Sequence, residues 1–434
     1  MTRKMKDSGV EWIGMIPDGW NVGRLGAVLA DRNESNNPVK TDVILSLTND
    51  RGVILYADKG NQGNKSKDDI TQYKLAYPND IVLNSMNVVI GSVGLSPYFG
   101  AVSPVYYMLY PRNDKTTSIR FFDYIFQTTV FQQSLRGYGN GIMEIRMRIQ
   151  MQKLKTVMLA YPSKEEQERI VRILDAKCAS IDDVIAKTTE SIEEYKKLKQ
   201  AVITEAVTKG VRGKRPMKDS DVDWIGQIPK EWDVVALRYL GQCQNGISKG
   251  AEFFGSGYPF VSYSDVYKNI ELPKSVDGLV QSTDEERERY SVKRGDIFFT
   301  RTSETIEEIG FTSVCTKDIE NATFAGFLIR VRPIDDSLNP DYAKYYFRSD
   351  IHRRYFVKEM IIVIRASLGQ ELLKKLPVLL PSKEEQREIA DYLDSKCAAI
   401  DTLISKKQQF IDELTAYKKS LIYEFVTGKK EVPA

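Results

Sequence analysis

This chain contains an ordered duplication of two separate stretches. The stretch PSKEEQERIVRILDAKC at 162–178 returns as PSKEEQREIADYLDSKC at 381–397, and MKDSGVEWIGMIPDGW at 5–20 returns as MKDSDVDWIGQIPKEW at 217–232. Two long copies differ from the three or more short units that a solenoid needs. We therefore expect two similar bodies related by a pseudo-twofold axis within one chain.

Between the repeated stretches lie two variable segments of low similarity. The opening copies are 212 residues apart (5 to 217) and the helical copies are 219 apart (162 to 381), so the second variable segment is seven residues longer. We divide the chain into a head, a variable segment and a helical segment, followed by a second such set. The six ranges are 1–20, 21–160, 161–212, 213–232, 233–379 and 380–434.

The two helical segments carry start signals and a seven-residue apolar repeat. Ser163 and Ser382 precede Lys-Glu-Glu-Gln, so each serine can cap a helix whose acidic first turn suits the helix dipole. Apolar residues then recur in two adjacent rows, as in a coiled-coil seam. The rows contain Leu174, Ile181, Tyr195 and Val202 beside Cys178, Ile185 and Ile192, then Leu393, Ile400, Leu414 and Leu421 beside Cys397, Ile404 and Ile411.

Both copies interrupt the seam at the same place, with Thr188 in the first and Lys407 in the second. A helix of about 45 residues is roughly 68 Å long, and neither helix can bury such a stripe alone. We therefore predict that the two helices pack against each other in antiparallel orientation. The alternative is that each helix packs only on its own domain. The expected pairing residues are Leu174, Ile181, Ile185, Ile192, Leu393, Ile400, Ile404 and Ile411.

The variable segments are predicted to be mixed α/β domains. Helical stretches are expected near 121–133 and 341–356. Despite low identity the two segments align in order, since Asp80 matches Asp296 and Arg146 matches Arg365. The predicted fold is therefore a pair of pseudo-symmetric α/β domains joined by two long antiparallel coiled-coil helices. Strand-like runs occur at 43–47, 80–83, 105–109, 296–300 and 327–331.

Several catalytic classes are disfavoured by the residues present. A chain whose only histidine is His352 offers neither a Ser-His-Asp triad nor an HExxH zinc site, and it has no GxxxxGK[ST] phosphate loop. The nuclease-like Glu194-Tyr195-Lys196 falls on the helical seam. No two of the four cysteines form a CxxC pair, so we expect no metal site.

The chain shows no membrane or export signal. No window approaches 18 apolar residues, and the first residues, MTRKMKDSGVEWIG, lack an apolar signal core. We therefore expect a cytoplasmic protein with reduced cysteines and no membrane partner. The formal net charge of +3 neither demands nor excludes nucleic acid, so a DNA binder of this length would have to cluster its basic residues locally.

One motif pair suggests an enzymatic alternative. Phe253-Phe254-Gly255-Ser256-Gly257 resembles the glycine loop that holds S-adenosylmethionine in methyltransferases, and Asn339-Pro340-Asp341-Tyr342 resembles their Asn-Pro-Pro-Tyr loop. A cofactor loop should follow an apolar strand and open a helix, whereas this one follows polar residues and runs into a strand-like stretch. We favour a turn at Gly255 and a helix start at Asn339.

Basic residues with aromatics and amides nearby are candidates for DNA contact, because lysine and arginine neutralise phosphates while arginine and amides can also bind base edges. Arg146 and Arg365 occupy the same position in the two halves. In the first half the candidates are Arg136, Tyr138, Asn140, Arg146, Arg148 and Lys153, and in the second they are Arg301, Arg348, Arg353, Arg354, Lys358 and Arg365.

These features together resemble the DNA specificity subunit of type I restriction-modification enzymes. The resemblance rests on the heads IGMIPDGW and IGQIPKEW, the strands YPFVSYSD and GDIFFTR, and the two PSKEEQ helix starts, and it covers nearly the whole chain. It implies that 21–160 and 233–379 are target-recognition domains, each of which reads one half of a bipartite site in double-stranded DNA. The first domain departs from the pattern, since Asn84-Ser85-Met86 stands where the second has Thr300-Arg301-Thr302.

The same resemblance implies how the chain takes part in a complex. The long helices would separate the two domains and would dock two methyltransferase (modification) subunits, which motor-nuclease (restriction) subunits join. The chain itself would not be an enzyme and would carry no cofactor, because S-adenosylmethionine binds the partner methyltransferase. A stand-alone adenine methyltransferase and a coiled-coil scaffold that does not bind DNA remain the alternatives.

Overall fold

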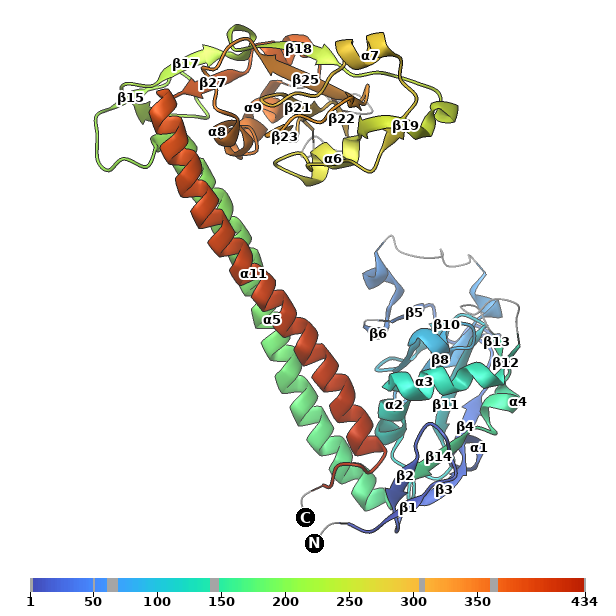
Figure 1. Cartoon of the computed structure of the whole chain (residues 1–434). Coiled ribbons are helices and arrows are strands. Elements are labelled where there is room, and N and C mark those ends of the chain that lie inside the picture. The colour runs from blue at the N-terminus through green and yellow to red at the C-terminus, as the bar shows by residue number, and fades with distance from the viewer. Residues whose placement is uncertain are drawn as a thin grey trace. The chain divides into compact units, whose positions relative to one another are not determined.

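The computed structural model describes residues 3–49, 51–60, 69–140, 148–303, 309–359 and 366–432. The chain forms two compact units, of which unit 1 comprises 1–189 with 409–434 and unit 2 comprises 190–408. Each unit contains one head, one variable segment and one half of each long helix (Figure 1). The units therefore divide both long helices near their middle.

Unit 1 is built on a four-stranded antiparallel sheet in the order β4-β11-β8-β9, with α2 and α3 packed beside it. Its elements up to the first long helix are β1 (Met5–Asp7), β2 (Met15–Pro17), β3 (Asn21–Arg24), α1 (Leu25–Val28), β4 (Leu29–Arg32), β5 (Leu45–Thr48), β6 (Gly52–Leu55), β7 (Lys74–Ala76), β8 (Ile81–Asn84), β9 (Val93–Leu95), β10 (Gly100–Val102), β11 (Tyr106–Pro111), α2 (Ile119–Gln127), α3 (Thr129–Ser134), β12 (Gly139–Asn140), β13 (Arg148–Ile149), α4 (Met151–Leu154) and β14 (Met158–Tyr161).

Unit 2 repeats this sheet in the order β18-β25-β21-β23. Its elements between the long helices are β15 (Met217–Asp219), β16 (Gln227–Pro229), β17 (Asp233–Ala236), β18 (Gly241–Asn245), β19 (Phe254–Val261), α6 (Tyr263–Lys268), β20 (Leu279–Val280), α7 (Asp284–Arg289), β21 (Ile297–Thr300), β22 (Thr302–Ser303), β23 (Thr312–Val314), β24 (Thr323–Phe324), β25 (Leu328–Pro333), α8 (Pro340–Tyr346), α9 (Ile351–Glu359), β26 (Ala366–Ser367), α10 (Gln370–Lys374) and β27 (Pro377–Leu380).

The predicted strands at 80–83, 105–109, 296–300 and 327–331 are confirmed as β8, β11, β21 and β25, with boundaries shifted by one or two residues. The predicted strand at 43–47 is β5, which begins later, at Leu45. The two predicted helical stretches are each broken into a pair, α2 with α3 and α8 with α9. The mixed α/β prediction is therefore confirmed.

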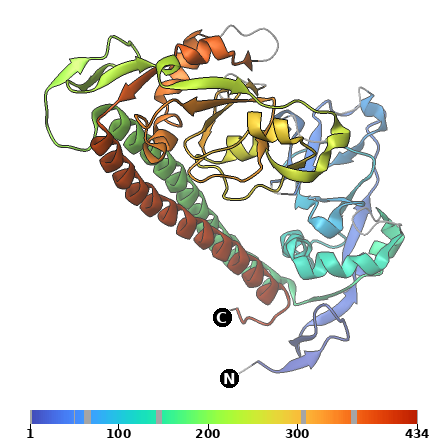
Figure 2. The same ribbon diagram turned by 45° about the horizontal axis from the view of Figure 1, so that its top comes forward.

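The long helices α5 (Lys164–Lys209) and α11 (Lys383–Val426) pack antiparallel (Figures 1 and 2). In unit 1, Leu174, Cys178 and Ile181 share a buried core with Leu421, Ile422 and Phe425. In unit 2, Ile203, Ala206 and Val207 share a core with Ile389, Leu393 and Cys397. Both cores also contain residues of the adjoining domain, so each helix packs on its partner helix and on a domain at once.

Two equivalent ion pairs follow the pseudo-twofold symmetry of this helix packing. In unit 2 the Lys199 ammonium lies 2.6 Å from Asp401, and in unit 1 Lys418 lies 2.7 Å from Asp182. The offset of 219 exchanges the two pairs, because Asp182 corresponds to Asp401 and Lys199 to Lys418. Pairs this exposed add little stability, but they define the register of antiparallel pairing.

The remaining predicted pairing residues lie along the seam with graded burial. Ile192 and Ile400 are buried, whereas Ile185, Ile404 and Ile411 are half-buried. Burial along the seam therefore varies even between equivalent positions, since Ile192 is buried and Ile411 is half-buried.

The start of each long helix explains why the head and the PSKEEQ stretch are repeated together. In unit 1 the Trp20 indole N–H donates to Glu166 (3.2 Å), and in unit 2 that of Trp232 donates to Glu385 (3.0 Å). The predicted caps are present, since Ser163 Oγ accepts from the backbone N–H of Glu166 and Ser382 Oγ from that of Glu385. Head and helix start thus form one repeated joint.

Each joint is completed by the glutamine of PSKEEQ, which links the helix to its domain. The Gln167 amide accepts from the Ser118 N–H (2.8 Å) and donates to the Pro162 carbonyl (2.9 Å). Gln386 accepts from the Asn339 N–H (2.7 Å) and donates to the Pro381 carbonyl (3.0 Å). Both glutamines are buried, so the helix start is held by interactions that water does not weaken.

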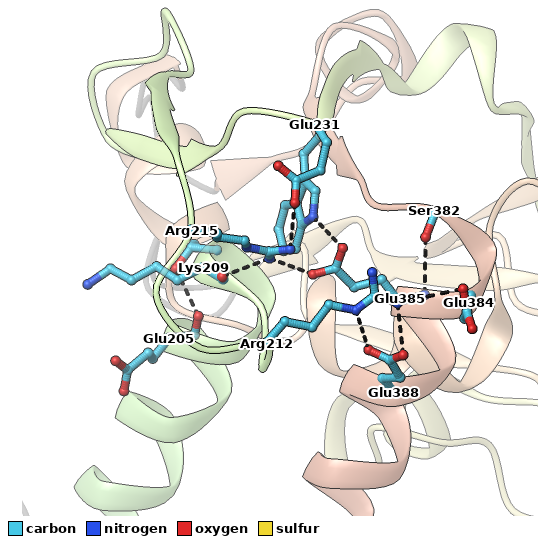
Figure 3. Close-up of polar contacts among 11 residues, drawn as sticks. Glu205, Lys209, Arg212, Arg215, Glu231, Ser382, Glu384, Glu385 and Glu388 are labelled. Carbon is cyan, nitrogen blue, oxygen red and sulfur yellow. Dashed lines mark hydrogen bonds and ion pairs between the residues drawn. The ribbon is translucent and has the colours of Figure 1, made fainter.

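In unit 2 an arginine pair adds to the joint (Figure 3). Arg215 lies 2.5 Å from Glu385 and 2.9 Å from Glu231, and it donates to the Lys209 carbonyl at the end of α5. Arg212 donates to both carboxylate oxygens of Glu388 (2.6 and 2.8 Å). The end of α5 is therefore fastened to the start of α11 through the loop that connects it to the second head.

Candidate nucleic-acid interface

In unit 1 a polar edge forms where strand β8 ends. The carbonyl of Ser85 accepts from the Ile149 N–H (2.9 Å), and the Ser85 hydroxyl donates to the Val105 carbonyl (2.9 Å). Ile149 belongs to β13, which pairs with β12. The base of the hairpin formed by β12 and β13 is thereby attached to the end of the central sheet.

Unit 2 repeats this attachment. The carbonyl of Arg301 accepts from the Leu368 N–H (2.7 Å), and β22 pairs with β26. Ser85 and Arg301 each lie five residues after the matched Asp80 and Asp296, so they occupy equivalent positions. The two units share the backbone of this edge and differ in the side chains that it presents.

The candidates of the first half gather around the hairpin. Arg136 is exposed at the end of the short 3-10 helix Leu135–Tyr138, and Tyr138 is half-buried against the core. Asn140 lies on β12, Arg148 is exposed on β13, and Lys153 is exposed on α4. Arg146 lies outside the described residues.

Sequence reasoning missed Lys74 on β7, which joins this group. Its ammonium donates to the Tyr106 carbonyl (3.3 Å) and lies 5.5 Å from the centre of the Tyr107 ring. Burial and then the positive charge of nearby Arg148 lower the pKa of Lys74. Two cations held close together favour an anionic ligand. The signal was present in the sequence, because Lys74 stands among tyrosines in YKLAY.

The candidates of the second half are spread more widely. Arg301 is half-buried at the edge, and Arg354 is exposed on α9. Arg353 and Lys358 also lie on α9. Arg365 lies outside the described residues.

Arg348 has an internal role instead. Its guanidinium donates to the carbonyls of Thr312 (3.0 Å), Tyr267 (2.7 Å) and Val266 (3.4 Å), and it lies 4.4 Å from the centre of the Phe311 ring. Burial lowers the pKa of this arginine. Because its donors hold α6 and β23 to the segment between α8 and α9, we do not include Arg348 in the interface.

Of the two interpretations, the helix start at Asn339 is confirmed, whereas Gly255 lies in a strand and not in a separate turn. Gly255 and Gly257 lie within strand β19 and do not open a helix. Asn339 caps α8, and its side-chain oxygen accepts from the N–H groups of Asp341 and Tyr342. Across the described ranges, no three His, Cys, Asp or Glu side chains are grouped as metal ligands, and no helix there is long and apolar enough to span a membrane.

Solved structures show that this architecture is a known fold. A chain from a study of complex assembly and conformational transition of the type I R-M system superposes with a TM-score of 0.71 at 17% identity, covering 96% of this chain and 99% of that chain. The HsdS subunit from Thermoanaerobacter tengcongensis superposes with a TM-score of 0.53 at 17% identity, covering 96% and 98%.

Sequence comparisons agree with the fold. The MjaVIII specificity subunit, from a type I restriction enzyme of Methanocaldococcus jannaschii, is 25% identical over 71% of this chain and 70% of the relative. The EcoKI specificity subunit of Escherichia coli is 24% identical over 63% of this chain and 58% of the relative. A family model described as the type I restriction modification DNA specificity domain matches residues 17–194 and 229–413. The chain therefore belongs to the family of type I restriction-modification DNA specificity subunits, the non-catalytic components of these complexes.

Proposed function

We propose that each unit reads one half of a bipartite site in double-stranded DNA through the edge where its central sheet meets the hairpin. The observation that carries this proposal is the repeated hydrogen bond, Ile149 to Ser85 in unit 1 and Leu368 to Arg301 in unit 2, beneath different side chains. A common backbone with different polar groups is suited to reading two different sequences in the same way.

The reading residues we propose for unit 1 are Lys74, Arg136, Tyr138, Asn140, Arg148 and Lys153, and the sequence alone adds Arg146. Lysine beside arginine, with tyrosines beneath, provides phosphate neutralisation and a base-edge donor at one place. For unit 2 we propose Arg301 and Arg354, with Arg353, Lys358 and Arg365 in the same part of the chain.

The helix pair supplies the proposed docking surface for methyltransferase subunits. Val184 and Tyr417 in unit 1, and Leu198 and Leu403 in unit 2, are 37–51% exposed although they are apolar. The offset of 219 relates Val184 to Leu403 and Leu198 to Tyr417, so each unit carries one copy of the same apolar patch. Two equivalent patches can bind two identical methyltransferase subunits.

These patches lie on the helix flank away from the domains. Each patch residue lies three positions after a seam residue, as Val184 lies after Ile181. The helix residues that bond to the domains, Asp175 and Asp394, instead lie one position after a seam residue. Asp175 accepts from Tyr124 (2.5 Å) and Asp394 from Tyr345 (2.7 Å). At about 100° per residue the two flanks face roughly opposite directions, so a partner can dock without displacing a domain.

In this arrangement the methyltransferase subunits bind S-adenosylmethionine, and the restriction subunits bind to the complex through them. The length of the long helices sets the number of base pairs between the two half-sites. Half-sites one duplex turn apart require about 34 Å between readers, a distance that either long helix can bridge.

The test is a map of methylated adenine in DNA from cells that express this chain with its methyltransferase, beside cells that express either alone. We expect methylation at one split motif only when both are present. Arg301→Ala should relax the half read by unit 2, and Arg148→Ala the half read by unit 1, while the matched charge variant Lys115→Ala should leave both unchanged.

The same map distinguishes the alternatives. Methylation by this chain alone would establish a stand-alone methyltransferase. An active methyltransferase that gains no new motif from this chain would favour the scaffold, and so would duplex affinity that is independent of salt, because phosphate contacts make affinity fall steeply with salt concentration.

A further inference from the structure

Gly255, Ser256 and Gly257 form a bulge in strand β19 of unit 2. The proposed DNA contacts do not involve this bulge. Phe254 and Tyr258 both pair with Val280 of β20, so the three residues between them bulge out of the strand. Both glycines have positive φ, and a Cβ at Gly257 would lie 2.5 Å from the Val280 carbonyl oxygen. The bulge therefore requires glycine and has a defined shape.

Hydrogen bonds hold the bulge in place. The Gln281 N–H donates to the Phe253 carbonyl (2.8 Å), and the Gln281 amide donates to the Ser256 hydroxyl (3.1 Å). Phe254 also packs edge-to-face on the buried Phe260, with ring centres 5.2 Å apart. A projection held this firmly loses little conformational entropy when a partner binds.

The projection presents apolar side chains to solvent. Phe253, Phe254 and Tyr258 are 38–41% exposed, and Leu279 of the paired strand is 36% exposed. Residues 251–258 are all exposed. Aromatic residues clustered on a rigid projection are typical of the anchors of a protein interface.

The charges around the projection disfavour DNA as its ligand. Lys249 pairs with Glu286 (2.7 Å), and Arg287 pairs with Asp284, so the two cations beside the aromatic rings are already neutralised. Residues 249–290 contain eight Asp and Glu against five Lys and Arg, although the whole chain is net positive. Phosphates would be repelled by this acidic surround, whereas a basic protein surface would be attracted.

Unit 1 has no aromatic residue at the corresponding place. The parallel bridge between Ile44 and Ala101 matches the pairing of Phe260 with Thr323 in unit 2. The equivalent of 254–258 is therefore 38–42, with the sequence PVKTD. The projection is a single feature of the chain, unlike the docking patches of the helix pair.

We propose that the aromatic bulge of Phe253, Phe254 and Tyr258 docks a basic, apolar-bearing surface of one methyltransferase subunit. This inference rests on the proposed docking of two such subunits, and it adds a contact that only one of them makes. The subunit held at unit 2 thus has an anchor that the other lacks.

The test compares the double variant Phe253→Ala/Tyr258→Ala with Tyr239→Ala, which removes an aromatic side chain of unit 2 that is 61% exposed elsewhere. Phe254 is left in place because it packs on Phe260. A second variant, Glu285→Lys/Glu288→Lys, reverses charge on α7 without touching the rings. Binding of the purified methyltransferase to the full chain is measured by titration and native mass spectrometry, and duplex affinity is measured alongside.

We expect the aromatic variant and the charge-reversal variant each to weaken one of the two methyltransferase binding events by at least tenfold, with the other event and duplex affinity unchanged. Unchanged methyltransferase binding in both variants overturns the inference. This holds even if the variants change the affinity for duplex DNA or the self-association of the chain. If the unmodified chain and Tyr239→Ala also fail to bind methyltransferase, the proposed docking itself fails.

Discussion

Glu385 and Glu166 occupy equivalent places at the two helix starts, yet their surroundings differ. The Glu385 side chain is 1% exposed and its partner Arg215 is 10% exposed, whereas Glu166 and its partner Arg3 are 15% and 28% exposed. Removing one member of a buried ion pair leaves the other charge unpaired in a region of low dielectric, and this costs more than the pair itself contributes.

We therefore predict that Glu385→Gln destabilises unit 2 by about 3 kcal/mol, while Glu166→Gln destabilises unit 1 by about 1 kcal/mol. Urea unfolding of the two variants, each compared with the unmodified chain, measures the difference. Equal losses would show that the arginine loop of unit 2 adds nothing to the joint.

Asp123 on α2 is a buried carboxyl group whose contribution to the free energy of unfolding depends on pH. Its Oδ2 accepts from Arg120 (3.0 Å) and Gln127 (2.8 Å). Burial raises the pKa of Asp123 to about 6, against the Arg120 charge, which lowers it. The folded state therefore binds this proton more tightly than the unfolded state, so the resulting stability is full below pH 3.8 and is lost as pH rises through 6.

We predict that the unmodified chain gains about 1 kcal/mol relative to Asp123→Asn when pH falls from 7 to 5. Chemical unfolding of both chains at the two pH values isolates this group, since other carboxylates contribute equally to both. A stability difference that does not change between the two pH values would show that folding does not raise the pKa of Asp123.

The two long helices are the elements that we propose set the spacing between the two half-sites. Thr188 and Lys407 occupy the same seam position, so a heptad inserted after each preserves both the apolar rows and the pairing. Seven residues add about 10 Å of helix, which corresponds to roughly three base pairs of duplex.

We predict that the double insertion yields a methylated motif with unchanged half-sites and a spacer about three base pairs longer. An insertion of four residues at the same two positions serves as control, because it rotates the apolar rows out of register and should abolish recognition. An unaltered spacer after the double heptad insertion would falsify the proposal that helix length sets the spacing.

For the whole molecule, the duplication of the apolar patch predicts the stoichiometry of the proposed complex. Leu198→Asp/Leu403→Asp removes the apolar patch of unit 2, and Val184→Asp/Tyr417→Asp removes that of unit 1. Each should reduce binding from two methyltransferase subunits per chain to one. Ser191→Asp, in the same helical row as Val184 and Leu198 but polar already, should retain two, as native mass spectrometry can show. Loss of both subunits from either variant would contradict two separate patches.

Several features were predictable because they depend on residues close together in the chain. The heptad rows from Leu174 and Leu393 predicted both long helices, since a 3.5-residue period needs no tertiary context to specify a seam. Ser163 and Ser382 predicted the helix starts. The alignment of Asp80 with Asp296 placed Ser85 and Arg301 in equivalent positions, and backbone hydrogen bonds then gave both the same attachment.

Other features depended on pairings between distant segments. Lys74 lies within electrostatic range of Arg148, 74 residues away in the sequence, only through the fold, and Arg348 is internal because carbonyls of α6 and β23 both accept from it. Likewise Asp80 pairs with Arg32 of β4, while the matched Asp296 pairs with Arg332 of β25. Periodicity and capping by themselves determined the repeated framework of this protein. Which charges lie at the proposed DNA edge and which are internal depended on the folded chain, because burial and ion pairing arise between residues that are far apart in the sequence.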